Sequence, residues 1–155
     1  MKQGYDKLLA DDIDFYIGII SKKVDTNYLV KKIYETRLIL ISPIDFELEK
    51  DTPLPLILPE HEELAERIEH SIKELKIPIN IHSQVKGHEA ILAMVSAGLG
   101  CAMLPEIVVK KSYLNTQIKE INTKKALPIL DIGLFVKKEE NSRLSPQKTL
   151  FWEFI

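Results

Sequence analysis

The sequence predicts an α/β protein built from two lobes with mainly parallel sheets. Short apolar runs alternate with amphipathic helical segments, which is the order typical of α/β folds. The 155 residues are 45% apolar, enough for a substantial core. Two long extended stretches, 28–41 and 127–136, bracket the middle of the chain. If both cross between lobes, residues 1–43 and 133–155 form the first lobe and residues 44–132 form the second.

Seven segments have the apolar character of strands. The run at 14–20 is almost continuously apolar, which predicts a strand buried on both faces. The run at 54–58 is also apolar, and Pro55 within it indicates an edge or the start of a strand. Strict alternation predicts the strand at 77–85. In chain order we expect strands at 14–20, 28–41, 54–58, 77–85, 99–104, 118–121 and 127–136.

Helix boundaries are indicated by proline, glycine and acidic residues. Pro59 and Pro105 stand where helices are expected to begin, a position that needs no N–H. Gly98 is expected to end a helix, and Ser145-Pro146 to open the last one. We expect helices at 4–10, 59–75, 88–97, 105–112 and from 145 onward. The helix at 59–75 carries acidic residues in its first turn and an apolar stripe at Leu64, Ile68, Ile72 and Leu75.

Composition excludes several classes of protein. The net charge is −2 and the isoelectric point is about 6.1, whereas surfaces that bind nucleic acid are usually basic. The single cysteine, Cys101, permits no internal disulfide and fits a reducing compartment. The first residues lack the apolar core of a signal peptide, and no run is long enough to span a membrane. We expect a soluble cytoplasmic protein without a membrane partner.

The chemical motifs of enzymes and metal proteins are incomplete. Gly98 and Gly100 follow a predicted helix, whereas a dinucleotide loop follows a strand and has a third glycine. His88-Glu89 resembles the start of a zinc-protease helix, but Leu92 occupies the place of the second histidine. Cys101 has apolar neighbours, which favour a buried structural thiol over a nucleophile. We therefore expect no catalytic residues, no metal and no cofactor.

The remaining chemistry is anion binding. The backbone amides at Gly87, His88 and Glu89 are expected to be free at the start of their helix, as are those of Glu60 and His61. Such helix starts favour a small anion in a cleft between the lobes, outside the carboxyl ends of the strands. The hydroxyl groups of Ser42 and Ser83 are further candidates. The residues we expect at the effector site are Gly18, Ser42, Pro59, Glu60, His61, Gly87, His88 and Glu89.

Four segments in order resemble the effector-binding domain of LysR-type transcriptional regulators. The most specific is residues 85–109, VKGHEAILAMVSAGLGCAMLPEIVV, with its striped helix, its Ala-Gly-x-Gly, an apolar strand and Leu-Pro. The others are LLADDIDFYIGI, ETRLILISP and IGLFVKKEENSRLSPQKTLFWEFI. The resemblance implies a two-lobed fold like type II periplasmic binding proteins, with Ser42 at the hinge and Gly18 allowing close backbone approach.

Within this family, residues 58–60, 87–91 and 104–108 are most similar to the regulators of isoleucine–valine synthesis. That similarity implies an effector such as acetolactate or acetohydroxybutyrate, both hydroxy-keto acid anions. It also implies a homodimer or homotetramer. The helix-turn-helix, the long linker helix and the first strand–helix–strand of the effector domain have no counterpart in the sequence. We therefore expect an incomplete first lobe with an uncovered sheet edge, and DNA binding only through the absent N-terminal domain.

Two alternatives of other classes stay open at this point. A transport-type solute-binding protein shares the two-lobed plan and would carry an export signal. A small α/β enzyme would need a catalytic pair, for which Cys101 and His88 are the residues to test.

Overall fold

The computed structural model describes residues 2–21, 25–49, 52–138 and 144–155. The chain forms two compact units, residues 1–35 with 130–155 (unit 1) and residues 36–129 (unit 2). The predicted lobe boundaries lie at 43 and 133, later than these unit boundaries. The chain passes between the units twice, inside the strands Tyr28–Pro43 and Ile129–Lys137, and neither crossing falls on a proline or glycine. Of the predicted first lobe, residues 22–24 and 139–143 lie outside the described residues.

Unit 1 is a small sheet with two helices. It contains α1 (Lys2–Leu9), β1 (Tyr16–Ile19), the first part of β2 (Tyr28–Pro43), β7 (Ile129–Lys137) and α5 (Pro146–Phe154). β7 lies between β1 and β2, and β1 pairs with it antiparallel. An aromatic cluster around Phe135 fills the core, with the ring of Tyr5 edge-on at 5.1 Å between centroids.

The expectation that the first strand is buried on both faces was wrong. β1 comprises only four residues, and the side chain of Ile17 is 57% exposed. The strand stands at the end of the sheet order, where one edge has no neighbour among the described strands. An apolar run reports hydrophobicity, but it does not report how many elements cover it.

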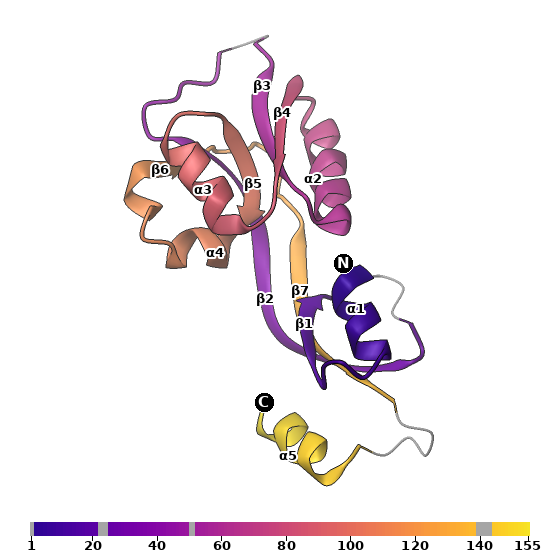
Figure 1. The fold of residues 1–155 in the computed structure, drawn as a ribbon. Coiled ribbons are helices and arrows are strands. Elements are labelled where there is room, and N and C mark those ends of the chain that lie inside the picture. Colours follow the sequence, from indigo (N-terminus) through magenta and orange to yellow (C-terminus); the bar gives the residue numbers. More distant parts are fainter. Residues whose placement is uncertain (1, 22–24, 50–51, 139–143) are drawn as a thin grey trace. The chain divides into compact units, whose positions relative to one another are not determined.

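Unit 2 contains a mixed sheet. Its strands are the second part of β2, β3 (Leu54–Pro59), β4 (Ile79–Val85), β5 (Cys101–Pro105) and β6 (Ile118–Glu120). The order is β2-β5-β3-β4, and β6 pairs with β2. β3 runs parallel to both β4 and β5, whereas β2 pairs antiparallel with β5 and β6. The predicted α/β class is confirmed, and its parallel part is the β5-β3-β4 segment (Figure 1).

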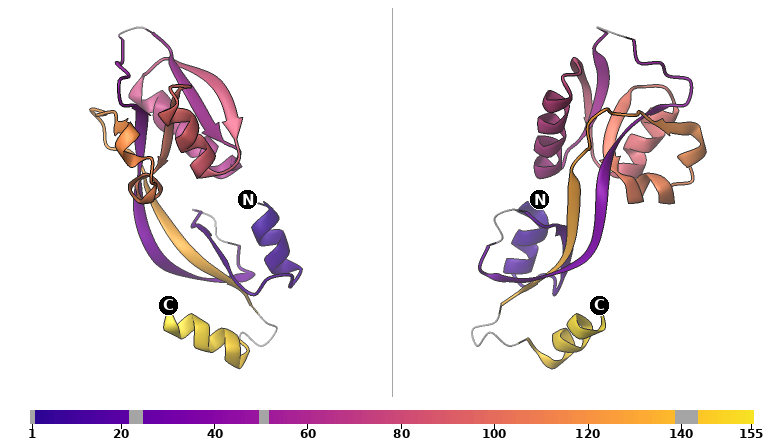
Figure 2. Two further views of the ribbon diagram at one scale, coloured as in Figure 1. Left: turned by 60° about the vertical axis from the view of Figure 1, so that its left-hand side comes forward. Right: turned by 180° about the vertical axis from the view of Figure 1, so that it is seen from behind.

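Helices cover both faces of the unit 2 sheet. α2 (Glu62–Leu75) and α3 (His88–Ser96) lie on opposite faces (Figure 2). The predicted stripe of α2 is confirmed, since Leu64, Ile68 and Ile72 are at most 2% exposed. Ile91 and Leu92 of α3 join the core cluster on the other face. The shorter α4 (Glu106–Lys111) and η1 (Asn115–Gln117) follow β5.

Of the two prolines predicted to begin helices, Pro105 does so and Pro59 does not, and both also end strands. Pro59 is the last residue of β3, and Pro105 is the last residue of β5. Helix α2 begins three residues after Pro59, with His61 as its N-cap, while Pro105 is itself the N-cap of α4. Proline suits both places because it lacks an N–H, so its position alone does not distinguish them.

Candidate functional site

The candidate site lies where two neighbouring parallel strands of unit 2 end. Pro59 of β3 pairs with Val85 of β4, so the connections that follow both strands leave the same edge of the sheet. The amide of Glu60 donates a hydrogen bond to the Val85 carbonyl over 3.1 Å, which holds the two connections together. The prediction that the Glu60 amide is free was therefore wrong. His61 follows β3 and is the N-cap of α2. Gly87 follows β4 and is the N-cap of α3, whose first residue is His88.

The beginning of α3 offers uncapped backbone donors. Its N-cap is Gly87, which has a φ of 92° and supplies no side chain. The Ile91 amide donates to the Gly87 carbonyl, but no side chain within the described residues accepts from the first-turn amides of α3. A Cβ built on Gly87 meets no atom within 4 Å, so the space in front of this helix end is open. Free amides at a helix start form a favourable environment for an anion.

The beginning of α2 is capped by an imidazole. The Nδ1 atom of His61 accepts a hydrogen bond from the Leu64 amide over 3.4 Å. An accepting Nδ1 carries no proton, so the neutral ring must carry its hydrogen on Nε2. The cap thereby leaves His61 with one N–H donor that the helix does not use. Burial lowers the pKa of His61 below its ordinary value of 6.5, although nearby Glu63 opposes this shift.

His88 is half-buried at the first position of α3. Burial lowers its pKa below 6.5, and the nearby His61 lowers it further, against the opposing effect of Glu89. Both imidazoles are therefore neutral at neutral pH. The influence of His61 on His88 agrees with the pairing of Pro59 with Val85, which brings both strand ends together.

The acidic residues near the site are mostly engaged elsewhere. Oε2 of Glu89 accepts a hydrogen bond of 3.0 Å from the Ser112 hydroxyl, which ties α3 to the end of α4. Glu63 pairs through Oε1 with Arg67 at 2.9 Å. Glu60 is exposed. One oxygen of the Glu89 carboxylate is thus held by the fold, and Glu89 is an exposed residue like Glu60.

The pair of Glu63 and Arg67, which lies in the first turns of α2, was not among the predicted site residues. Their side chains are 14% and 26% exposed. The i,i+4 spacing of an acid and a base on a predicted helix was a signal that could have found them. Two buried polar atoms lack a hydrogen-bond partner within the described residues, Oε2 of Glu63 and Oγ of Ser83.

Ser42 lies elsewhere in unit 2, and Gly18 belongs to unit 1. Ser42 is wholly buried in unit 2, and its hydroxyl donates to the Pro43 carbonyl over 3.1 Å. Because β2 runs antiparallel to β5, Ser42 lies toward the beginning of β5, at the opposite end of the parallel strands from Gly87. Gly18 belongs to unit 1, where a Cβ on it would come within 2.5 Å of the Tyr16 ring.

Unit 2 contains the single cysteine. Cys101 is buried, as predicted, and burial raises the pKa of its thiol to about 11. In the part of the chain that the structure describes, no three metal-ligating side chains come together. No helix among the described residues is long and apolar enough to cross a membrane.

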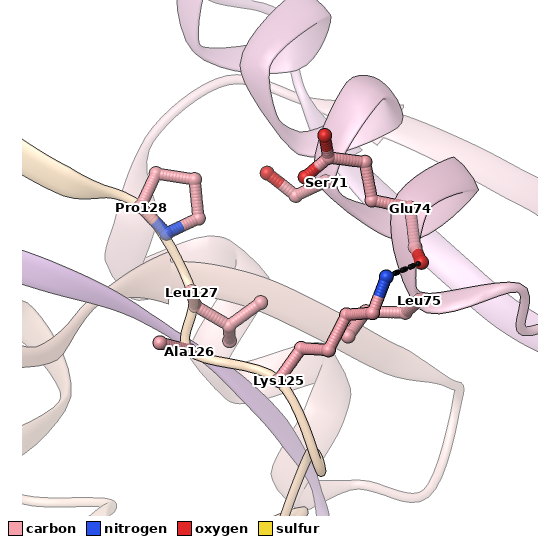
Figure 3. Close-up of a pocket in the computed structure, with 7 residues that line it drawn as sticks. All are labelled: Ser71, Glu74, Leu75, Lys125, Ala126, Leu127 and Pro128. Atoms are coloured by element: carbon pink, nitrogen blue, oxygen red, sulfur yellow. Dashed lines mark hydrogen bonds between the residues drawn. The ribbon is translucent and has the colours of Figure 1, made fainter.

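A pocket of about 220 Å³ lies at the other end of α2 from His61 (Figure 3). Its walls are the last turns of α2 and residues 125–128. The Lys125 ammonium donates to the Glu74 carbonyl over 3.1 Å, where it caps the negative end of the helix. None of the predicted site residues lines this pocket.

A comparison with protein families identifies the class to which the chain belongs. The family described as "LysR substrate binding domain" matches residues 2–155. The chain belongs to this family, the effector-binding domains of LysR-type transcriptional regulators. The result favours a regulatory sensor over the two alternatives, a transport-type solute-binding protein and a small α/β enzyme.

The chain is also similar to individual curated proteins. A Haemophilus influenzae protein, described as the HTH-type transcriptional activator IlvY, is 32% identical over 121 residues, which are 77% of this chain and 39% of that protein. A Salmonella typhimurium protein of the same description is 35% identical over 75 residues, which are 45% of this chain and 25% of that protein. The chain thus spans well under half the length of the curated relatives it matches.

Solved structures share the fold. The apo regulatory domain of HypT from Salmonella typhimurium has a TM-score of 0.83 at 13% identity, covering 99% of this chain and 76% of that chain. The effector-binding domain of QuiR has a TM-score of 0.80 at 18% identity, covering 99% and 75%. Together with the family match, these likenesses confirm the predicted fold class, resembling type II periplasmic binding proteins.

Proposed function

We propose that this chain senses a small hydroxy-keto acid anion, such as acetolactate or acetohydroxybutyrate, at the strand-end site of unit 2. The sensing controls genes of isoleucine–valine synthesis. The bound anion lies in front of α3, against the amides that follow Gly87 and beside the imidazoles of His61 and His88. Pro59, Glu60 and Glu89 belong to the same site. Gly18 and Ser42 keep the roles that the family resemblance implies, close backbone approach and the hinge, and Ser42 does not contact the anion.

The observation that carries the proposal is the convergence of unused donors at one sheet edge. The first-turn amides of α3 have no side-chain cap, and His61 keeps one N–H free of its helix. A carboxylate accepts from backbone amides, while a keto or hydroxyl oxygen on the next carbon accepts from an imidazole N–H. The site therefore suits an acid with a second oxygen close to its carboxylate.

The relatives are regulators, and one of the solved structures holds a small acid. The two curated relatives described above are both named as transcriptional activators of the IlvY type. One of the solved relatives of similar fold is described as a complex with shikimate. These descriptions concern other proteins, and they agree with a small polar effector for this chain.

The proposed partners follow from a regulatory role. The effector favours one arrangement of the sensing domain and so biases a homodimer or homotetramer, which contacts DNA through a helix-turn-helix domain. No membrane takes part in the proposed regulation. Control of transcription requires access to DNA, so we place the protein in the cytoplasm, acting as a sensor rather than as an enzyme.

A thermal-shift panel tests the proposed function. A ligand that binds only the folded state raises Tm, by an amount that grows with its concentration. We expect acetolactate and acetohydroxybutyrate to raise Tm, and simple acids such as acetate to have a much smaller effect. The proposal fails if neither hydroxy-keto acid raises Tm at any concentration tested.

Two variants show where the ligand that raises Tm is bound. His88→Ala removes an imidazole from the site and is expected to abolish most of the shift. Lys125→Ala changes the pocket at the other end of α2 and is expected to leave the shift intact. The reverse pattern would place the ligand in that pocket instead.

A further inference from the structure

The two histidines of the strand-end site are held differently by the backbone. His61 accepts the Leu64 amide at Nδ1, and this bond fills the atom that a second proton would need. His88 stands at the start of α3 and makes no cap hydrogen bond. Protonation of His61 would break the cap of α2, whereas protonation of His88 breaks no hydrogen bond found among the described residues.

The charged groups around His61 and His88 permit one added positive charge on His88. Glu63, which acts on His61, is paired with Arg67, and Glu89, which acts on His88, is held by Ser112. Glu60 and Lys86 are exposed in the two connections and have opposite charges. Without a ligand, the positive end of α3 and the burial of the ring both disfavour a charged His88.

We propose that effector binding is linked to proton uptake, with His88 taking a proton from solvent when a carboxylate occupies the site, while His61 stays neutral and donates from Nε2. This inference rests on the proposed function and adds to it a dependence on pH. The ligand carboxylate adds a second negative charge beside His88, next to that of Glu89. A charged His88 then donates a charge-assisted hydrogen bond, which is stronger than a neutral one.

Proton uptake has a measurable consequence. The affinity for the carboxylate must rise as pH falls, by at most about tenfold per pH unit for one proton. The acid itself does not contribute, because its carboxylate is ionised throughout the range from about pH 6 to about pH 8. The expected change over that range is a tenfold or larger gain in affinity at the lower pH.

Isothermal titration of acetolactate into the full chain tests this linkage. Titrations in buffers of different ionisation enthalpy count the protons taken up. For the wild type we expect uptake of up to one proton near neutral pH. His88→Gln should bind more weakly and without dependence on pH. His61→Asn keeps an N-cap acceptor and should keep the dependence on pH.

Matched controls and a second measurement keep the test decisive. His70→Gln and His82→Gln change the two exposed histidines of unit 2 and should behave as the wild type. Heteronuclear NMR of the ligand-free protein should show a neutral His61 with its hydrogen on Nε2 and a neutral His88 at neutral pH. A charged His88 in the free protein would overturn the inference whatever the ligand.

The possible results separate the two proposals. Binding of acetolactate with an affinity that does not change with pH overturns the proton linkage and leaves the proposed function standing. A pH dependence that survives in His88→Gln also overturns the linkage. Failure of every hydroxy-keto acid to bind at any pH overturns the proposed function and the linkage together.

Discussion

His61 combines a structural and a binding role in one ring. Its Nδ1 atom caps α2 through the Leu64 amide, and the same bond fixes which nitrogen carries the hydrogen. A backbone contact thereby decides what the other edge of the ring offers to a ligand. His88 has no such constraint, so the two histidines differ in chemistry although both are neutral at neutral pH.

Stability should depend on pH through these two residues. Burial lowers the pKa of His61 and His88 in the folded state, so the unfolded chain binds protons first as pH falls. Their contribution is present above about pH 6.5 and is lost as pH falls from there through the folded pKa values. Urea unfolding at a series of pH values should show a midpoint that decreases across this window.

The double variant His61→Asn with His88→Gln isolates the effect. It should flatten the decrease, because no buried imidazole remains at the site. His70→Gln with His82→Gln changes the same number of histidines at exposed positions and should leave the decrease in place. A wild-type midpoint that stays constant from about pH 7 down to about pH 5 would contradict this account of the two rings.

The cap itself can be tested at the same residue. His61→Ala removes the acceptor for the Leu64 amide and should lower the free energy of unfolding by about 1 kcal/mol. His61→Asn restores an acceptor of a type that favours N-caps and should recover most of the loss. Equal unfolding free energies for the alanine and asparagine variants, measured by urea denaturation, would show that the ring does not act as a cap.

The start of α3 depends on a backbone conformation that glycine alone adopts readily. Gly87 has a φ of 92° and a ψ of 132°, and a Cβ there would meet open space. Gly87→Ala should therefore destabilise the protein through backbone strain, by about 1–3 kcal/mol, with no steric clash. Because the strain shifts the first-turn amides, the variant should also bind acetolactate more weakly, as measured by titration calorimetry.

Gly98 provides the matched control at the other end of the same helix. Its φ is 81°, and a Cβ added there would likewise meet no atom within 4 Å. Gly98→Ala should destabilise the protein while leaving acetolactate affinity close to that of the wild type. Equal losses of affinity in the two variants would mean that the start of α3 has no special role in binding.

Elements of the two units should differ in local stability. Helix α5 has no buried residue, and the side chain of Phe154 is 88% exposed. All five residues of β5 are buried within the unit 2 sheet. Hydrogen exchange followed by mass spectrometry should show α5 exchanging far faster than β5. Comparable protection of the two would indicate that another surface covers α5 in solution.

The sequence carried enough information for the fold class of the molecule and the order of its elements. The alternation of apolar runs and striped helices predicted strands close to the observed ones, and the stripe of α2 is buried as expected. The direction of pairing was not predictable in the same way. β2 turns antiparallel to β5 through contacts between residues that are about sixty positions apart in the sequence, which local patterns do not record.

The candidate site was predictable only in part. Pro59 pairs with Val85 because β3 and β4 are adjacent parallel strands. The sequence could therefore predict that His61, Gly87 and His88 lie at the same edge of the sheet. The hydrogen bond that holds Glu89 against Ser112 is a tertiary contact between two helices. The role of His61 as the N-cap of α2 was also not predicted from the sequence, because the position of Pro59 suggested an earlier helix start.

The strand-end site of unit 2 is proposed to bind a small hydroxy-keto acid. An NMR titration of the full chain with acetolactate, following the backbone amides, tests this binding. The largest shifts should occur at residues 87–90 and at His61, and they should saturate with a single affinity. Saturable shifts confined to Ser71, Lys125 and their neighbours around the pocket at the other end of α2, or no saturable shifts at all, would rule out binding at the strand-end site.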